Sequence, residues 1–390
     1  MNQMTAVVIA ALVAILAVVG LLTGSEDGKQ EGSAAASAPS IVSIARRVER
    51  LRELRFEHLP RVRRVSWEQA RADGLRELDR DVPPREVAAE ERLLKLLRLV
   101  PPDASLRVLL GKTLSSEVGG YYVPRTGTLS VVGAGAEGGL LGEITLAHEL
   151  THALEDQHFG LESPPPTGFN RDRSTAESAL HEGTATIAMV DYAVLKQGGT
   201  AHVPASLRAQ ALKALDKAAV PASSGLPRYL REGLVFPYAA GARLVNRIQG
   251  RGGWPAVDRA FEGDGPVSTE QVMHPAKLDG HQRPVRVVVT PPRGAQLVER
   301  GDFGEFDTEQ MLRAANGRVR SGRAAAGWGG GGFALWRTGA RDGLELRWVW
   351  DSARDAREFA EALGRSARRL GGASENSSIK GIELVLSPRD

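Results

Sequence analysis

The segment that most constrains this chain is His148-Glu-Leu-Thr-His152, which lies in a stretch of strong helix character, residues 144–158. Positions i and i+4 of an α-helix lie on one face, so the imidazoles of His148 and His152 can point at one metal ion, with Glu149 beside them to take a proton from water. Zinc accepts two imidazoles and a carboxylate and keeps a fourth position for water. The pattern therefore predicts a catalytic zinc site on a partly buried helix.

A third protein ligand is expected from the next helical segment, residues 174–196. We favour Glu182, because small residues surround it at helical spacing and would let its helix pack closely against the metal helix. Glu177 lies five residues earlier, about 140° around the helix, so the two glutamates cannot both face one metal ion.

His158 is the alternative third ligand. His148, His152 and His158 have the spacing of a pattern in which the chain turns at a glycine and brings a third histidine back to the metal. Here Glu155, a good helix former, stands at the turn position. If the helix continues, His158 lies about 240° around from His152 and makes a polar contact at the helix end instead.

A glycine pattern lies just before the metal helix. Residues 133–138 fit the dinucleotide-binding fingerprint, and Glu155 follows at the distance of the ribose-binding acid. That acid should end a second strand, yet it lies in the histidine-rich helix, and no alternation of strands and helices follows. We interpret the glycines as a flexible loop that leads into the metal helix.

Composition narrows the class of protein. The chain has 390 residues, of which 42% are hydrophobic, enough for two domains with appendages. Fifty basic residues are offset by forty-seven acidic ones, and the net charge of +3 argues against general nucleic-acid binding. The absence of cysteine excludes thiolate zinc ligands, disulfides and a lipidated cysteine.

The N-terminus is expected to meet a membrane. Residues 5–22 are almost wholly apolar and would span about 27 Å as a helix, close to one bilayer core. We expect residues 1–23 to be a retained transmembrane anchor, with a cleaved signal as the alternative, and residues 24–40 to be a flexible linker. Acidic residues follow the apolar run, so the prediction is a single-pass protein of the cell membrane with most of the chain periplasmic or extracellular.

Residues 41–64 are rich in arginine. Near a membrane this segment could attract anionic headgroups. The favoured interpretation is a solvated amphipathic helix with Glu–Arg pairs four residues apart.

The remaining segments predict an α+β fold. Residues 83–99 read as a helix, residues 119–132 as a hairpin, and the chain beyond residue 200 as mainly helical to about residue 263. The strand just before the metal helix could be an exposed edge that binds a peptide by β-addition.

From about residue 284 the sequence predicts a small α+β domain without a catalytic constellation. Strands are expected at residues 285–289, 333–337, 344–350 and 379–386, a helix at 352–370, and a glycine-rich loop at 327–332. The tryptophans of this region are expected in its core: Trp328, Trp336, Trp348 and Trp350.

The chain resembles a family of bacterial, mostly uncharacterised, extracytoplasmic zinc metallopeptidase-like proteins of the gluzincin, thermolysin-like type. The resemblance rests on residues 120–127, 147–159, 180–186, 236–238, 268–275 and 327–330. It implies that Glu182 is the third ligand. Val123 stands where relatives carry Asp, and Thr186 stands at the Asp position of thermolysin's Asn-Glu-x-x-Ser-Asp segment. A carboxylate behind the ligands would therefore come from elsewhere, with Asp156 as the candidate, or be missing.

These inferences predict a mainly helical, zincin-type catalytic domain with an edge hairpin, residues 41–283, and a small α+β C-terminal domain, residues 284–390. The expected activity is zinc-dependent hydrolysis of a peptide or protein substrate outside the cytoplasm. Zinc would lower the pKa of its bound water to about 7, and Glu149 would accept the proton. His274 and Tyr238 are candidates to stabilise the oxyanion. The alternative is a non-catalytic, membrane-anchored scaffold or binding protein that retains a structural zinc.

Overall fold

The computed structural model describes residues 40–113, 119–133, 139–162, 168–200, 202–215, 225–370, 373–377 and 381–386. The predicted anchor and nearly all of the predicted linker lie outside these ranges, as does most of the glycine pattern at residues 133–138. Among the helices of the described ranges, none combines the length and the apolar character needed to cross a bilayer.

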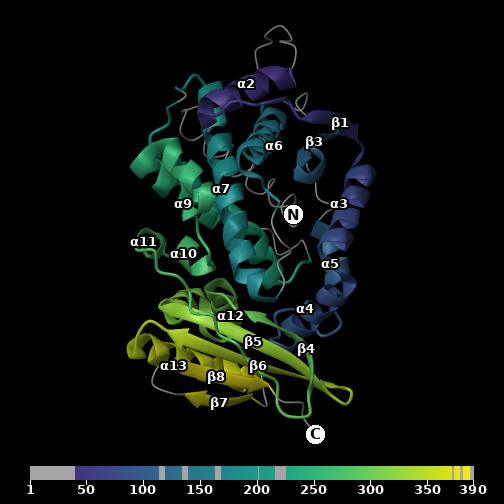
Figure 1. The fold of residues 1–390 in the computed structure, drawn as a ribbon, viewed down its shortest axis with the longest axis vertical. Helices are drawn as coiled ribbons and strands as arrows, with labels where there is room; N and C mark the ends of the chain where they lie inside the picture. The colour runs from purple at the N-terminus through teal and green to yellow at the C-terminus, as the bar shows by residue number, and fades with distance from the viewer. Residues whose placement is uncertain are drawn as a thin grey trace.

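The described chain forms a helical body at one end and a five-stranded sheet at the other (Figure 1). Three long helices make the centre of the body: α6 (Leu140–Phe159), α7 (Arg171–Lys196) and α9 (Arg228–Arg259). Around them lie α2 (Ile41–Arg52), which packs on α6 and α7, α8 (Ala205–Leu215), α10 (Thr269–Met273) and α11 (Pro275–Asp279). On the opposite side, three helices run down toward the sheet: α3 (Trp67–Asp81), α4 (Pro84–Leu96) and α5 (Leu106–Thr113).

A small sheet lies beside the metal helix. Its strands are β1 (Arg61–Val65), β2 (Gly120–Val123) and β3 (Thr128–Val132), in the order β1-β3-β2. The predicted hairpin is confirmed, because β2 and β3 are antiparallel and Gly127, at φ 60°, closes the turn between them. β1 pairs with β3 in parallel. The strand just before the metal helix, β3, is therefore central rather than an edge, and β1 and β2 form the two edges.

The large sheet is antiparallel throughout and confirms the α+β class. Its strands are β4 (Gln296–Asp302), β5 (Trp328–Thr338), β6 (Arg341–Trp350), β7 (Ala373–Ser377) and β8 (Gly381–Leu386), in the order β4-β5-β6-β8-β7. Two helices, α12 (Glu305–Ala325) and α13 (Ala353–Leu370), share its apolar core. The prediction that the four tryptophans of this region are core residues is confirmed, since each is buried.

Two predictions in this region were wrong for one reason. The glycines at residues 329–332 lie inside β5 rather than in a loop, and residues 285–289 are extended but form no strand. A Cβ on Gly330 would overlap the carbonyl oxygen of Val285, and one on Gly332 would overlap that of Val287. The glycines thus let an extended segment lie directly against the strand, a use of glycine that a strand interior allows.

The largest apolar clusters of the described residues do not follow the predicted domain boundary. One cluster joins α2, α6, α7 and α9. The other joins α4 and α5 with the large sheet, α12 and α13. Helices from the first third of the chain therefore share a core with its last third, and a division after residue 283 stays a prediction.

Candidate metal centre

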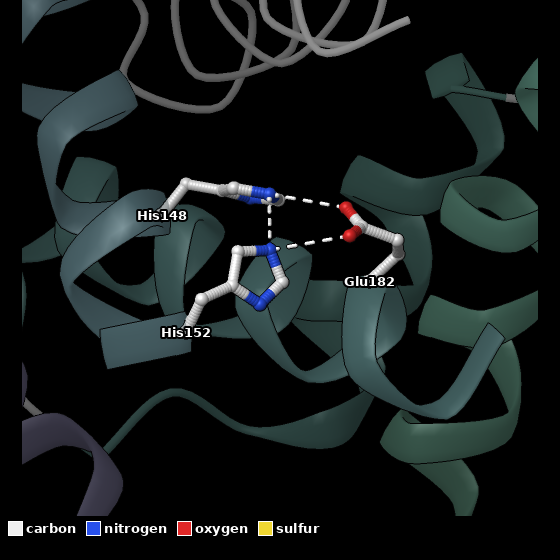
Figure 2. Close-up of side chains that lie close together, drawn as sticks. All are labelled: His148, His152 and Glu182. Carbon is white, nitrogen blue, oxygen red and sulfur yellow. Dashed lines mark hydrogen bonds and ion pairs between the residues drawn. The ribbon is translucent and has the colours of Figure 1, made fainter. Parts of the chain in front are cut away.

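Helices α6 and α7 bring the three predicted metal ligands together. Nε2 of His148 lies 3.1 Å from Nε2 of His152 and 3.1 Å from Oε2 of Glu182, and Nε2 of His152 lies 3.2 Å from Oε1 of Glu182 (Figure 2). One turn of α6 separates the histidines, so both rings reach the same point, and α7 supplies the carboxylate from across the helix contact. All three side chains are buried.

The spacing of these donor atoms fits a zinc ion. A tetrahedral zinc ion with bonds of about 2.0–2.1 Å holds its donor atoms roughly 3.3–3.4 Å apart, close to the separations in this triad. Two imidazoles and one carboxylate are also a donor set that zinc accepts while keeping a position open. Two Nε2 atoms at 3.1 Å cannot both carry a proton toward each other, so either one proton or a metal ion can lie between them.

Without a metal the triad is an ion pair. Burial alone would lower the pKa of the His152 imidazole, but the charge and hydrogen bond of Glu182, with smaller effects of Glu149 and Glu155, raise it to about 9. Burial alone would raise the pKa of the Glu182 carboxyl, but His152 and His148 hold it well below its ordinary value. The metal-free site therefore binds a proton where a cation would lie.

Glu149 is fixed by the edge strand. Its Oε2 accepts a hydrogen bond from the backbone N–H of Tyr122 at 2.8 Å, while burial raises the pKa of its carboxyl. The Tyr122 hydroxyl donates to Oδ2 of Asp156 at 2.8 Å. Glu149 and Asp156 are seven residues apart and share one face of α6, so Tyr122 fastens β2 to that face at two points.

Asp156 does not support a ligand histidine. Its carboxylate accepts from the Tyr122 hydroxyl and from the backbone N–H of Leu161, rather than from a ring of the triad. No described side chain hydrogen-bonds Nδ1 of His148. The carboxylate that the resemblance leads one to expect behind the ligands is thus not supplied by Asp156.

Tyr238, on α9, lies at the site as expected. Its ring stacks on His148 with centroids 6.0 Å apart, and its hydroxyl hydrogen-bonds Glu182. Burial and the charges of Glu182 and Glu149 raise the pKa of the Tyr238 hydroxyl well above its ordinary value, so it stays protonated and donates. Tyr238 therefore orients the carboxylate of Glu182; a role at the oxyanion stays a prediction.

His274 is not brought to the triad. It caps the C-terminal end of α10, and its Nε2 lies 2.7 Å from Oε1 of Glu305, a hydrogen bond that raises the pKa of the imidazole. The other end of α10 is held by Asp172, through Thr269. Asp172 precedes Glu182 by ten residues on α7, about 15 Å along the helix axis. This position gives no support to an oxyanion role for His274.

His158 and Glu177, the two residues that the helix geometry disfavoured as ligands, face away from the triad. His158 Nε2 hydrogen-bonds the backbone carbonyl oxygen of Arg55 at 2.8 Å, at the end of α6. Glu177 pairs with Arg173 at 2.7 Å on α7. Both positions agree with the angles that an unbroken helix predicts.

Sequence reasoning missed a buried arginine behind the site. The guanidinium of Arg52 is fully buried, with Nε 2.8 Å from Oε1 of Glu155 and Nη2 2.7 Å from Oδ1 of Asp258. It also lies over the ring of Trp254, 4.6 Å from the centroid. Arg52, on α2, thus joins Glu155 of α6, which lies one turn after His152, to Asp258 of α9. The prediction of a solvated helix was wrong at this position. A signal existed, because Arg52 falls on the apolar stripe of α2, four residues after Val48.

The small residues near Glu182 serve a different contact from the one predicted. Gly183 packs against Gly241 of α9, and a Cβ on Gly241 would overlap the carbonyl oxygen of Ala179. The close crossing is therefore between α7 and α9, rather than between α7 and the metal helix. It brings Tyr238, one turn before Gly241, onto Glu182.

Comparison with known proteins covers only the C-terminal region. A family model described as a domain of unknown function, DUF8575, matches residues 294–383, which include β4 to β7 and do not include the triad. No curated protein and no solved structure matches the chain. The resemblance to zinc metallopeptidases therefore stays a prediction.

Proposed function

We propose that this protein is a zinc-dependent peptidase that acts on a peptide or protein substrate outside the cytoplasm. The observation that carries the proposal is the buried triad of His148, His152 and Glu182, at near-tetrahedral spacing, with the carboxylate of Glu149 held beside it. A purely structural metal site has no need of that fourth side chain.

The chain's own groups have clear tasks in such a reaction. A zinc ion on the triad would supply a Lewis acid and an acidified water molecule. Glu149 takes the proton of the attacking water and delivers it to the nitrogen of the departing amine. The Tyr122 N–H keeps its carboxylate in place, and Tyr238 keeps Glu182 in place.

The edge strand offers a place for the substrate backbone. Residues of an antiparallel strand alternate between hydrogen bonds to the partner strand and bonds to the free edge. The Tyr122 amide donates to Glu149, so Tyr122 and Gly120 present their polar backbone groups away from β3. The residues of β2 are buried and the Tyr122 amide is occupied by Glu149, so a peptide that adds to β2 in extended form would use the remaining backbone groups of this edge, beside Glu149.

The test is the Glu149→Gln substitution in the full chain. It keeps the shape and the three ligands, so zinc content and circular dichroism should match the wild type, while digestion of a diverse peptide library should slow by about a hundred-fold or more. Glu177→Gln is the matched control, since Glu177 lies off the site, and its rate should stay at the wild-type value. Equal cleavage by Glu149→Gln would remove Glu149 as the base. A folded, zinc-loaded wild type that cleaves nothing would favour the scaffold alternative.

A further inference from the structure

A strongly basic surface lies where the described chain begins. Residues 41–67 hold eight arginines and three glutamates, an excess of positive charge larger than the net +3 of the whole chain. Six of these arginines have exposed side chains and define, with the apolar residues described next, the basic rim: Arg46, Arg50, Arg55, Arg61, Arg63 and Arg64. One of the three glutamates, Glu49, is buried beneath Arg46 and Arg55.

Large apolar side chains stand among these arginines. Leu59 is 40% exposed, Val62 46% and Trp67 45%, all within nine residues of chain. Arginine next to exposed tryptophan and aliphatic side chains is the composition of surfaces that rest on a bilayer, where the apolar groups enter the headgroup region and the cations meet lipid phosphates.

The rim occupies one end of the molecule. Helix α2 and strand β1, which carry most of it, lie at the end opposite the five-stranded sheet (Figure 1). Helix α2 packs directly on α6, the helix that carries His148 and His152. A surface that rests on the rim would therefore lie close to the metal helix and far from the C-terminal sheet.

The chain before the rim indicates what that surface is. The apolar run at residues 5–22 ends eighteen residues before Ser40, the first described residue. Eighteen residues of a Gly- and Ser-rich chain without regular structure would have an average end-to-end distance of roughly 20–25 Å. An inserted run would thus hold the rim within reach of the bilayer.

We propose that the basic rim docks on an anionic lipid surface, with α2 toward the bilayer and the C-terminal sheet away from it. The lipid phosphates supply the opposite charge, and each arginine near such a surface strengthens binding by about five-fold. The docking needs no hydrolysis and no metal, so it stands or falls separately from the proposed activity.

The experiment uses the full chain, whose lack of cysteine allows clean labelling at a single introduced cysteine. Glu57→Cys, exposed beside the rim, and Ala340→Cys, exposed in the turn between β5 and β6, each receive a fluorophore. The protein is reconstituted in vesicles of phosphatidylcholine, alone or mixed with anionic phosphatidylglycerol, that contain a lipid-borne quencher. The charge variant is Arg50→Glu with Arg61→Glu, and its matched control is Arg318→Glu with Arg320→Glu, two exposed arginines of α12.

Docking predicts strong quenching of the Glu57→Cys label in anionic vesicles, which high salt and the rim variant abolish and the α12 variant does not. The Ala340→Cys label should stay unquenched. Equal quenching in neutral vesicles would show proximity through the tether alone and overturn the proposal. So would an unquenched Glu57→Cys label in anionic vesicles, or quenching of the Ala340→Cys label.

Discussion

Glu182 is the residue that most sharply tests the metal assignment. Glu182→Ala removes the only carboxylate of the described triad, so we expect most of the bound zinc to be lost. His158→Ala is the control, because His158 binds a backbone carbonyl at the end of α6, and it should keep its zinc. Metal content per folded chain, measured by mass spectrometry after dialysis, checks both. Zinc lost from His158→Ala and kept by Glu182→Ala would reverse the assignment.

Metal binding should also depend on pH through His152. Its imidazole is protonated in the metal-free chain up to a pKa of about 9, and a ligand nitrogen must be unprotonated. The proton stabilises the metal-free site below that pH, so apparent zinc affinity should rise by about ten-fold per pH unit and level off above it. Calorimetry in buffers of different ionisation enthalpy should therefore find about one proton released per zinc ion at neutral pH. Binding without proton release would contradict the ion pair.

The site could be predicted where one helix sets the geometry. The i, i+4 spacing places His148 and His152 on one face, and the angle between Glu177 and Glu182 leaves one of them for the metal. Tyr238 and His274 come from other helices, and their positions depend on how those helices cross α7. Sequence spacing contains no crossing angle, so both were equally plausible, yet only Tyr238 lies at the triad.

At the scale of elements, the close crossing of α7 and α9 positions Tyr238 beside Glu182. Gly241→Ala places a methyl group against the backbone of Ala179, so we expect unfolding free energy to fall by about 1–3 kcal/mol. Zinc retention should fall as well, because α9 carries Tyr238. Gly233→Ala is the control on the same helix, with open space around the added Cβ, and should be neutral or stabilising by up to about 1 kcal/mol. Urea denaturation measures both; equal stability of the two variants would refute the close contact.

Elements with a strong internal pattern were predicted, and elements defined by their neighbours were not. The helices that hold the ligands and the hairpin β2–β3 follow from periodicity and turn residues. The glycine run in β5 looks like a loop in the sequence, because the sequence does not show that residues 285–289 pack against this strand and leave no room for side chains there. Residues 285–289 look like a strand, but their backbone meets the face of β5 rather than adding to the sheet.

At the scale of the molecule, the shared core predicts cooperative unfolding. Four of the six tryptophans lie in the C-terminal region, whereas the longest helices form the body, so fluorescence and far-ultraviolet circular dichroism report on different parts. Because α4 and α5 belong to the core of the large sheet, the two signals should change at the same urea concentration. Two separate transitions would show that the sheet region unfolds on its own.

The α+β class could be predicted from the pattern of helical and β-prone segments in the sequence. The apolar core that α4 and α5 share with the large sheet could not. The apolar faces of α4 and α5 are visible as patterns, yet no pattern says which distant segment will cover them. Among the described residues, the next fully buried member of this core after Leu110 is Phe303, nearly two hundred residues later.

That separation has a consequence while the chain is being made. Ribosomes add roughly 5–20 residues each second, so the apolar faces of α4 and α5 emerge about 10–40 s before the strands that bury them. During that interval the nascent chain exposes these apolar faces, because the strands that cover them in the native structure have not yet been made. We expect a chaperone that holds unfolded chains to bind these helices during that interval. Crosslinking of the chaperone to stalled chains of increasing length should detect this binding, and the crosslinks should disappear once β5 and β6 have left the exit tunnel.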